Sequence, residues 1–144
     1  TKEEIDYANK MAQDNLSESV KDSEVTYAMV ASNQNGDSVN ITFEKLDEEY
    51  IESLVLSELY QSAIAEVESS YEKIGASSFD YEIAQLTLDG KTIDCCNTEI
   101  NISEYTMYQT AITLKCKGYI ANISCSSLTE EGVQEIINSF KWIN

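Results

Sequence analysis

Three short glycine-containing turns, each between stretches of alternating apolar and polar residues, constrain the fold of this chain most strongly. The turns are formed by Asn35 and Gly36, by Asp89 and Gly90, and by Lys117 and Gly118. Asn-Gly and Asp-Gly favour the left-handed backbone of a two-residue hairpin turn, and the Lys-Gly turn is supported by its flanks. The sequence therefore predicts three antiparallel β-hairpins.

The third hairpin, "KCKGYIANISC" at its centre, has a register that separates apolar from polar side chains. Pairing Cys116 with Tyr119 collects a mostly apolar face from Thr110, Ile112, Leu114, Cys116, Tyr119, Ala121, Ile123 and Cys125. The opposite face is mostly polar and consists of Gln109, Ala111, Thr113, Lys115, Ile120, Asn122 and Ser124. An antiparallel sheet with one buried face requires this pattern.

The other two hairpins give similar results. Pairing Leu88 with Lys91 in the second hairpin places Ala84, Leu86, Ile93 and Cys95 on one side. In the first hairpin, a two-residue turn aligns Ala28, Val30, Val39, Ile41 and Phe43 on one side. Because Tyr27, Met29 and Ala31 make its other side apolar as well, we expect both sides of the first hairpin to be covered.

Helices are predicted in the segments between and around the hairpins. A long helix begins at an Asp47 cap and ends at Gly75, with an apolar stripe at helical spacing formed by Ile51, Val55, Leu59, Ala63, Val67, Tyr71 and Ile74. A C-terminal helix begins after a Thr129 cap and presents Val133, Ile136, Ile137 and Phe140. A shorter helix over residues 3–15 presents Ile5, Ala8, Ala12 and Leu16.

The predicted order is helix, hairpin, long helix, four meandering strands and helix. This order indicates an α+β fold, with an antiparallel sheet of about six strands flanked by helices as an α/β/α sandwich. The length of 144 residues suits one domain, 1–144, with a hydrophobic core.

The stretch "YTMYQTAITLKCKGYIANISCSSLTEEGVQEIINSFKW" combines a long hairpin with a glycine turn, a short Thr-Glu cap and a terminal helix ending in "SFKW". It resembles the PsbP-like and Mog-type fold, and it is also similar to extracytoplasmic domains that Gram-positive bacteria carry behind a lipoprotein signal. Relatives of this fold share no catalytic motif, so the resemblance implies no site residue. It implies an extracytoplasmic, envelope-anchored or secreted location, and we expect an export signal or lipid anchor upstream of Thr1.

Charge and composition exclude several kinds of function. The chain has 9 Lys and Arg against 26 Asp and Glu, for a net charge of −17, which disfavours nucleic-acid and anionic-membrane partners. With no histidine, the commonest general base and the usual imidazole metal ligand are missing. Carboxylate runs at Glu3, Asp47 and Glu130 fall in first turns of predicted helices, where the helix dipole favours anions. We therefore assign no catalytic, cofactor-binding or metal-binding residue.

Four cysteines occur, at positions 95, 96, 116 and 125. The hairpin register separates Cys116 from Cys125 by about 20 Å along the strands, which is too far for a disulfide. No Cys-x-x-Cys pair of the zinc type is present, and adjacent Cys95 and Cys96 point to opposite faces of a strand. We interpret the cysteines as reduced core side chains, and we keep one alternative, a cross-strand bridge between Cys95 and Cys125.

Tyrosine is enriched, with 9 residues against 3 Phe and 1 Trp. Because tyrosine combines an apolar ring with a polar tip, it suits binding surfaces. Tyr27, Tyr105 and Tyr108 are our candidate binding surface, and half-buried positions in the sheet are the alternative interpretation.

Our leading hypothesis is a non-enzymatic, extracytoplasmic binding or accessory domain of a bacterial lipoprotein, with a protein or small ligand as its partner. We expect no nucleic-acid partner and no membrane insertion by these residues. The alternative is an acidic intracellular adaptor or immunity-type inhibitor that masks a basic protein surface. A hydrolase that uses carboxylates alone is a third hypothesis.

Overall fold

The computed structural model describes residues 25–143, and the helix predicted over residues 3–15 lies outside this part of the chain. The elements are β1 (Val25–Ser32), β2 (Ser38–Lys45), α3 (Glu48–Ser53), α4 (Leu56–Lys73), β3 (Ala76–Leu88), β4 (Lys91–Ile102), β5 (Tyr105–Cys116), β6 (Tyr119–Ser127) and α5 (Glu130–Ser139). None of the helices among the described residues is both long enough and apolar enough to cross a membrane.

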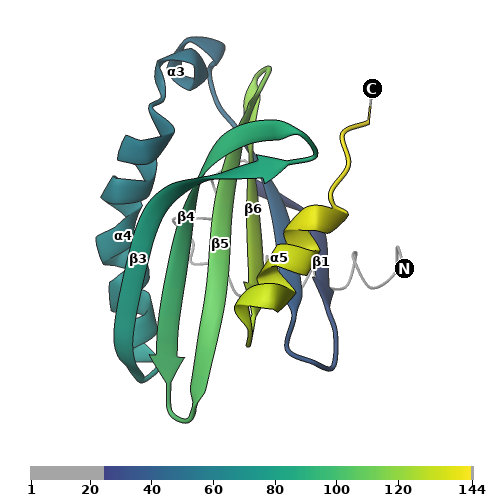
Figure 1. Cartoon of the computed structure of the whole chain (residues 1–144). Coiled ribbons are helices and arrows are strands. Elements are labelled where there is room, and N and C mark those ends of the chain that lie inside the picture. The colour runs from purple at the N-terminus through teal and green to yellow at the C-terminus, as the bar shows by residue number, and fades with distance from the viewer. Residues whose placement is uncertain (1–24, 144) are drawn as a thin grey trace.

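The strands form one antiparallel sheet of six strands, in the order β1-β2-β6-β5-β4-β3. Helix α5 lies against one face of the sheet, while α3 and α4 lie on the other face (Figure 1). The β3–β4 hairpin curves over the face that carries α5 (Figure 1). The predicted α+β architecture is thus confirmed.

Two of the three predicted hairpin registers are confirmed. Leu88 pairs with Lys91, and Cys116 pairs with Tyr119, so the predicted faces of both hairpins are correct. Asp89 has a φ of 44° and Gly90 a φ of 84°, which is the left-handed turn that Asp-Gly favours.

The predicted register of the first hairpin is wrong by one residue. Val30 was expected to lie on the side of Ile41, but Ile41 pairs with Met29 and Val39 pairs with Ala31. The connection is longer than a two-residue turn because the Asn33 side chain closes it. Asn33 Oδ1 accepts from the backbone nitrogens of Asn35 (2.8 Å) and Asp37 (3.1 Å). A slip of one residue moves side chains of a strand to the other face.

The predicted long helix is divided into α3 and α4. Between them Leu54 and Val55 have extended backbone, with ψ angles of 129° and 111°. Lys115, near the turn that ends β5, donates from Nζ to the carbonyl oxygens of Glu52 and Leu54. The last carbonyls of a helix have no partner within it, so this contact satisfies the end of α3.

The ends predicted for the helices are otherwise correct. Gly75 follows α4 with a φ of 95°, the left-handed conformation predicted for it. At α5, the Thr129 side chain accepts from the backbone nitrogen of Gly132 at 3.0 Å, so Thr129 is the N-cap.

The main core lies between α5 and the sheet. Its buried members are Leu88, Cys95, Ile112, Ile123, Cys125, Val133 and Ile137. The strand residues among them belong to the apolar face that the hairpin registers predict. The core therefore fixes α5 over the centre of the sheet and leaves part of β3 and β4 beside it uncovered.

Candidate functional site

A cleft of about 520 Å³ lies between α5 and strands β3, β4 and β5. The residues that line it through side chains on this face of the sheet or on α5 are Asp80, Glu82, Leu86, Asn97, Glu99, Tyr108, Thr110, Glu130, Val133, Gln134 and Ile137. This is the α5 face of the sheet, because Glu82 and Asn97 occupy the position two residues along from the core pair Ala84 and Cys95. Four carboxylates, from Asp80, Glu82, Glu99 and Glu130, are among the side chains that line this cleft.

Carboxylates dominate the rim of the cleft. Asp80 on β3 pairs directly with Glu99 on β4, and Glu82 is the next residue of β3 on the same face. The first turn of α5 adds Glu130 from the other wall. Like charges directly opposite each other in a sheet are destabilising. None of the described residues that line the cleft is Lys or Arg, so this repulsion has no counter-charge within the cleft.

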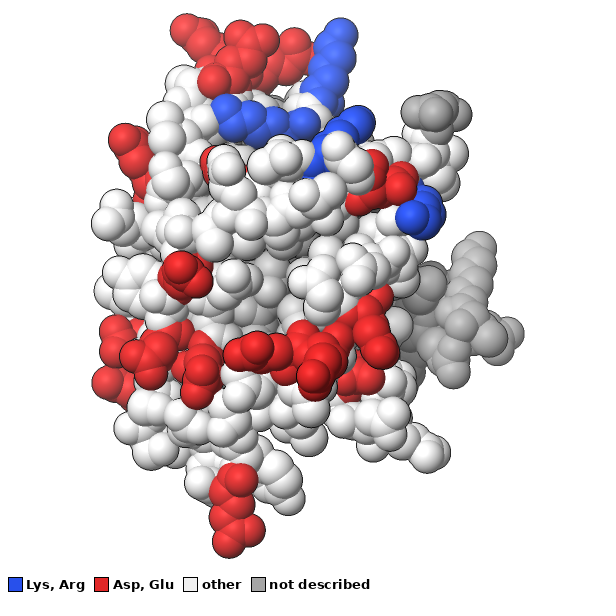
Figure 2. Space-filling view, in the orientation of Figure 1, with Lys and Arg blue, Asp and Glu red and all other residues white. Residues whose placement is uncertain are grey.

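The acidic rim belongs to a larger charged band. Figure 2 shows Asp and Glu side chains crossing this face of the molecule as a band, while the Lys side chains gather at one end. The carboxylates are spread across strands and helix, and the described residues contain no group of three or more His, Cys, Asp or Glu that could hold a metal ion. Because these carboxylates lie at separate positions on two strands and a helix, they can contact several positive charges at different positions.

The floor of the cleft is partly apolar and partly amide and hydroxyl. Leu86, Val133 and Ile137 supply the apolar part. Thr110 Oγ1 donates to Asn97 Oδ1 at 2.8 Å, which fixes the amide of Asn97 in the floor. A ligand that carries both aliphatic surface and charged nitrogen atoms would match this lining.

The N-terminal end of α5 is tied to the β1–β2 loop. Ser127, which is 2% exposed, donates from Oγ to Asp37 Oδ1 at 2.6 Å and accepts from the backbone nitrogen of Thr129 at 3.2 Å. Hydrogen bonds from Ser127 and then from Asn33 lower the pKa of Asp37. This contact positions the first turn of α5, and with it Glu130, against the cleft.

The C-terminal end of α5 is tied to the β3–β4 turn. The backbone nitrogen of Trp142 donates to Asp89 Oδ2 at 2.8 Å, and its indole nitrogen donates to the Leu88 carbonyl at 2.9 Å. Lys141 Nζ lies 3.2 Å from Asp89 Oδ1, and Lys91 Nζ lies 4.3 Å from the centre of the Trp142 ring. The backbone hydrogen bond from Trp142, followed by the Lys141 contact, lowers the pKa of Asp89.

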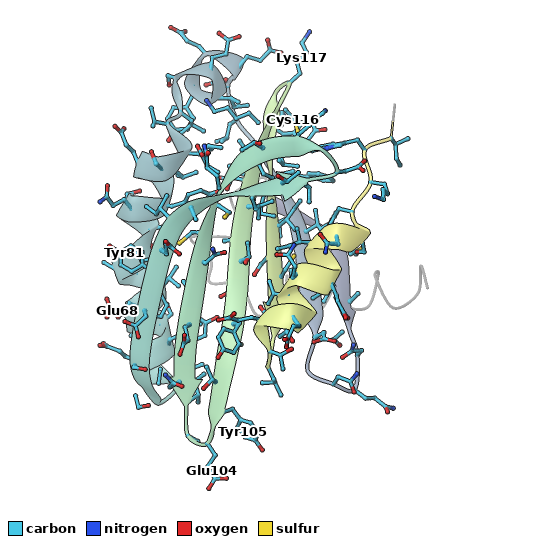
Figure 3. The ribbon with its side chains drawn as sticks, viewed as in Figure 1. Glu68, Tyr81, Glu104, Tyr105, Cys116 and Lys117 are labelled. Carbon is cyan, nitrogen blue, oxygen red and sulfur yellow. The ribbon has the colours of Figure 1, made fainter. Side chains whose placement is uncertain are left out.

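The three tyrosines predicted as a binding surface lie at separate places. Tyr27 lies on β1, where it pairs with Thr42. Tyr105 is 65% exposed and lies with Glu104 at the end of the sheet opposite Cys116 and Lys117 (Figure 3). Tyr105 and Tyr108 occupy alternate faces of β5. Of the three, Tyr108 lines the cleft.

The alternative of a bridge between Cys95 and Cys125 is wrong, because β5 lies between their strands. Cys95 pairs with Ile112, which pairs with Ile123, two residues from Cys125. Two strand spacings and this offset put their Cα atoms roughly 12 Å apart, and a disulfide needs less than about 7 Å. Both thiols are free and buried, and burial raises the pKa of each to about 11.

The opposite face of the sheet has a second hollow, a groove of about 450 Å³ between α4 and strands β2, β5 and β6. Beside it, Tyr60 Oη accepts from the backbone nitrogen of Thr113 at 2.8 Å and donates to the Asp94 carbonyl at 3.2 Å. Tyr71 Oη donates to Gln109 Oε1 at 3.1 Å. Burial raises the pKa of both tyrosines, and their hydrogen bonds anchor α4 to the sheet.

Comparison with known proteins identifies no family. No protein-family model matches the chain, and no curated protein matches it. A solved structure of a protein of unknown function, PA94 from Pseudomonas aeruginosa, is similar with a TM-score of 0.41 and 4% identity over 90% of each chain. This similarity is too weak to indicate a function. The resemblance to the PsbP-like and Mog-type fold stays a prediction.

Among the residues that line the cleft, the sequence singled out Tyr108 as a binding residue but not the carboxylates. Asp80 and Glu82 read as polar positions of an alternating strand, and Glu130 is already explained by the helix dipole. One signal was available, because the unbroken alternation from Asp80 to Leu86 places both carboxylates on the apolar side of β3. Charges on a core-facing row of a strand are a departure from ordinary patterning, and such departures mark functional sites.

Proposed function

We propose that this protein is a non-enzymatic binding domain whose cleft takes a basic segment of another protein. The observation that carries the proposal is that four carboxylates, from Asp80, Glu82, Glu99 and Glu130, line one cleft together with a partly apolar floor. Lys and Arg side chains combine a charged tip with an aliphatic stem, so they would satisfy the rim and the floor together.

Electrostatics supports this choice of partner. The net charge of −17 attracts cationic partners over long range, and association of this kind weakens as salt screens the charges. Carboxylates set on neighbouring strands about 5 Å apart suit successive positive groups of an extended chain better than a single ion. The apolar floor adds contacts that salt does not screen.

Two hypotheses about the cellular role stay proposals. One is an extracytoplasmic domain with a lipoprotein anchor, and the other is an intracellular inhibitor. A basic segment could belong to an envelope protein or to an intracellular protein whose basic surface is masked. Both hypotheses use the same cleft, so the binding test comes first. The sequence upstream of Thr1 in the intact gene then separates them, because a lipoprotein signal there favours the envelope.

Binding to the cleft is tested by calorimetry with a hexalysine peptide at low and high salt. In the double variant Glu82→Gln and Glu99→Gln, two exposed ion pairs of about 0.5–1 kcal/mol each are removed, so the affinity falls about 5- to 30-fold. The matched control is Glu68→Gln with Glu104→Gln, which removes two charges outside the cleft (Figure 3). Equal weakening in both double variants would show that net charge, and not the cleft, holds the peptide.

A further inference from the structure

We propose that the free edge of β3 takes the basic segment as an added antiparallel strand, with basic side chains at alternate positions of that segment. This inference rests on the proposed function, because it concerns the partner of the same cleft. It goes further by naming how the backbone of the partner is held and which sequence pattern the partner has. Two observations carry it, the unpaired edge of β3 and the sorting of side chains between the two faces of that strand.

β3 is an end strand of the sheet. In the described part of the chain it has β4 on one side and no strand on the other. The residues of such a strand alternate between those whose backbone bonds the neighbour and those whose backbone points outward. Because a two-residue turn joins the strands, Leu88 and Lys91 form a hydrogen-bonded pair, and so does every second residue of β3 before Leu88. The outward N–H and C=O groups therefore belong to Tyr81, Ile83 and Gln85.

The side chains of β3 are sorted by face in a way that suits a basic strand. Asp80 and Glu82 are exposed on the cleft face, whereas Tyr81 and Ile83 lie on the face of α4. Tyr81 is 47% exposed and lies at this edge of the sheet (Figure 3). An added strand would place basic side chains opposite the carboxylates and β-branched ones opposite Tyr81. Cross-strand pairs of both kinds are stabilising.

The pairing geometry brings the charged pairs close together. A residue whose backbone bonds β4 would face the added strand in a non-hydrogen-bonded pair, with Cα atoms about 4.5 Å apart instead of about 5.5 Å. Asp80 and Glu82 are residues of this kind. Lys or Arg stems that lie across β3 would then lead toward Glu99, which pairs with Asp80 on β4.

The same charges disfavour other partners of the edge. Two copies of β3 paired edge to edge would bring Asp80 and Glu82 of one copy close to those of the other, which is destabilising. β1, the strand at the other end of the sheet, carries no charged residue between Val25 and Ser32. A basic strand therefore has an electrostatic reason to pair with β3 and not with β1.

The test uses the acetylated peptide Lys-Thr-Lys-Val-Lys-Thr-Lys and two N-methylated forms of it. In an antiparallel pair with β3, its Thr and Val amides would donate to the outward carbonyl oxygens, while its Lys amides would face solvent. N-methylation of the Thr and Val amides should weaken binding in calorimetry at least about tenfold, because three backbone hydrogen bonds are lost. The control is N-methylation of the last three Lys amides, which adds the same methyl groups and should change the affinity less than about threefold.

Hydrogen exchange locates the added strand on the protein. In the complex with the unmodified peptide, the amides of Tyr81, Ile83 and Gln85 should exchange at least about tenfold more slowly than in the free protein. The amides of β1 should be unaffected. Slower exchange on β1 without protection of β3 would overturn the inference.

Failure of this inference and failure of the proposed function give different results. Equal affinities of the three peptides, with amide shifts at Asn97 and Thr110, would show that the cleft binds a basic segment without strand pairing. Weakening by Lys methylation alone would overturn the antiparallel orientation. If neither hexalysine nor the unmodified peptide bound in a saturable way, the proposed function would be overturned, and this inference with it.

Discussion

Replacing Gly132 by alanine tests how α5 is held against the sheet. A Cβ at this position would lie 2.1 Å from Ser127 Oγ and 2.8 Å from both Ser127 Cβ and Asp37 Oδ1. Real Cβ atoms do not approach other atoms this closely, so the first turn of α5, the Ser127 side chain or the β1–β2 loop must move. Ser127 is 2% exposed, which leaves little room for its hydroxyl to turn away.

The size of the effect follows from three terms. Overpacking of a tight contact costs about 1–3 kcal/mol. Leaving the buried Ser127 hydroxyl without its acceptor costs about another 1–3 kcal/mol. Alanine is favoured over glycine inside a helix by about 1 kcal/mol, which opposes these losses. We therefore expect Gly132→Ala to lower the free energy of unfolding by about 1–5 kcal/mol, with the centre of the range near 3 kcal/mol.

Urea unfolding followed by circular dichroism measures this loss, and a double-mutant cycle identifies its cause. Ser127→Ala removes the atom nearest to the new Cβ, so Gly132→Ala should cost at least about 1 kcal/mol less in the Ser127→Ala protein than in the wild type. Glu131→Ala, on an exposed position of the same turn, is the control and should change stability by less than about 0.5 kcal/mol. The reasoning is refuted if Gly132→Ala is as mild as the control.

Two further predictions concern the thiols and the C-terminal contact. Protein unfolded without reductant should show four alkylated cysteines by mass, and in the native state Cys95 and Cys125 should stay unlabelled because burial raises their pKa to about 11; two fewer labels after unfolding would show a disulfide. The folded pKa of Asp89 is lowered, so its contact with Trp142 contributes stability at neutral pH and is lost as the pH falls through the range below about 4. Trp142 is the single tryptophan of the sequence, and its fluorescence emission should shift to longer wavelength over that range. Asp89→Asn should abolish the transition.

The sequence predicted those parts of the fold that depend on local chemistry. The turn at Asp89 and Gly90 is set by residues that favour a left-handed backbone, and the register around Gly118 is set by alternation that continues on both sides. The first hairpin failed because Asn33, outside the Asn-Gly pair, builds a longer loop with its side chain. The turn preference of the Asn-Gly dipeptide alone does not predict this longer loop.

Long-range contacts account for the other differences. The break at Leu54 depends on Lys115, which comes from a strand more than 60 positions later in the chain. The cleft combines Glu82 on β3 with Glu130 on α5, and their proximity follows from the packing of α5 on the sheet. The alternation of β3 predicts on which face of the sheet Glu82 lies. No local pattern predicts that α5 places Glu130 in the same cleft.

The proposed binding of a basic segment is tested most directly by mapping where such a segment contacts the folded protein. We would titrate the nitrogen-15-labelled full chain with hexalysine and follow the backbone and side-chain amides. We predict saturable shifts at Asn97, Thr110 and Gln134, which line the cleft, and their loss in the Glu82→Gln and Glu99→Gln double variant. Shifts of equal size around Glu68 on α4, or shifts at the cleft that survive the double variant, would contradict it.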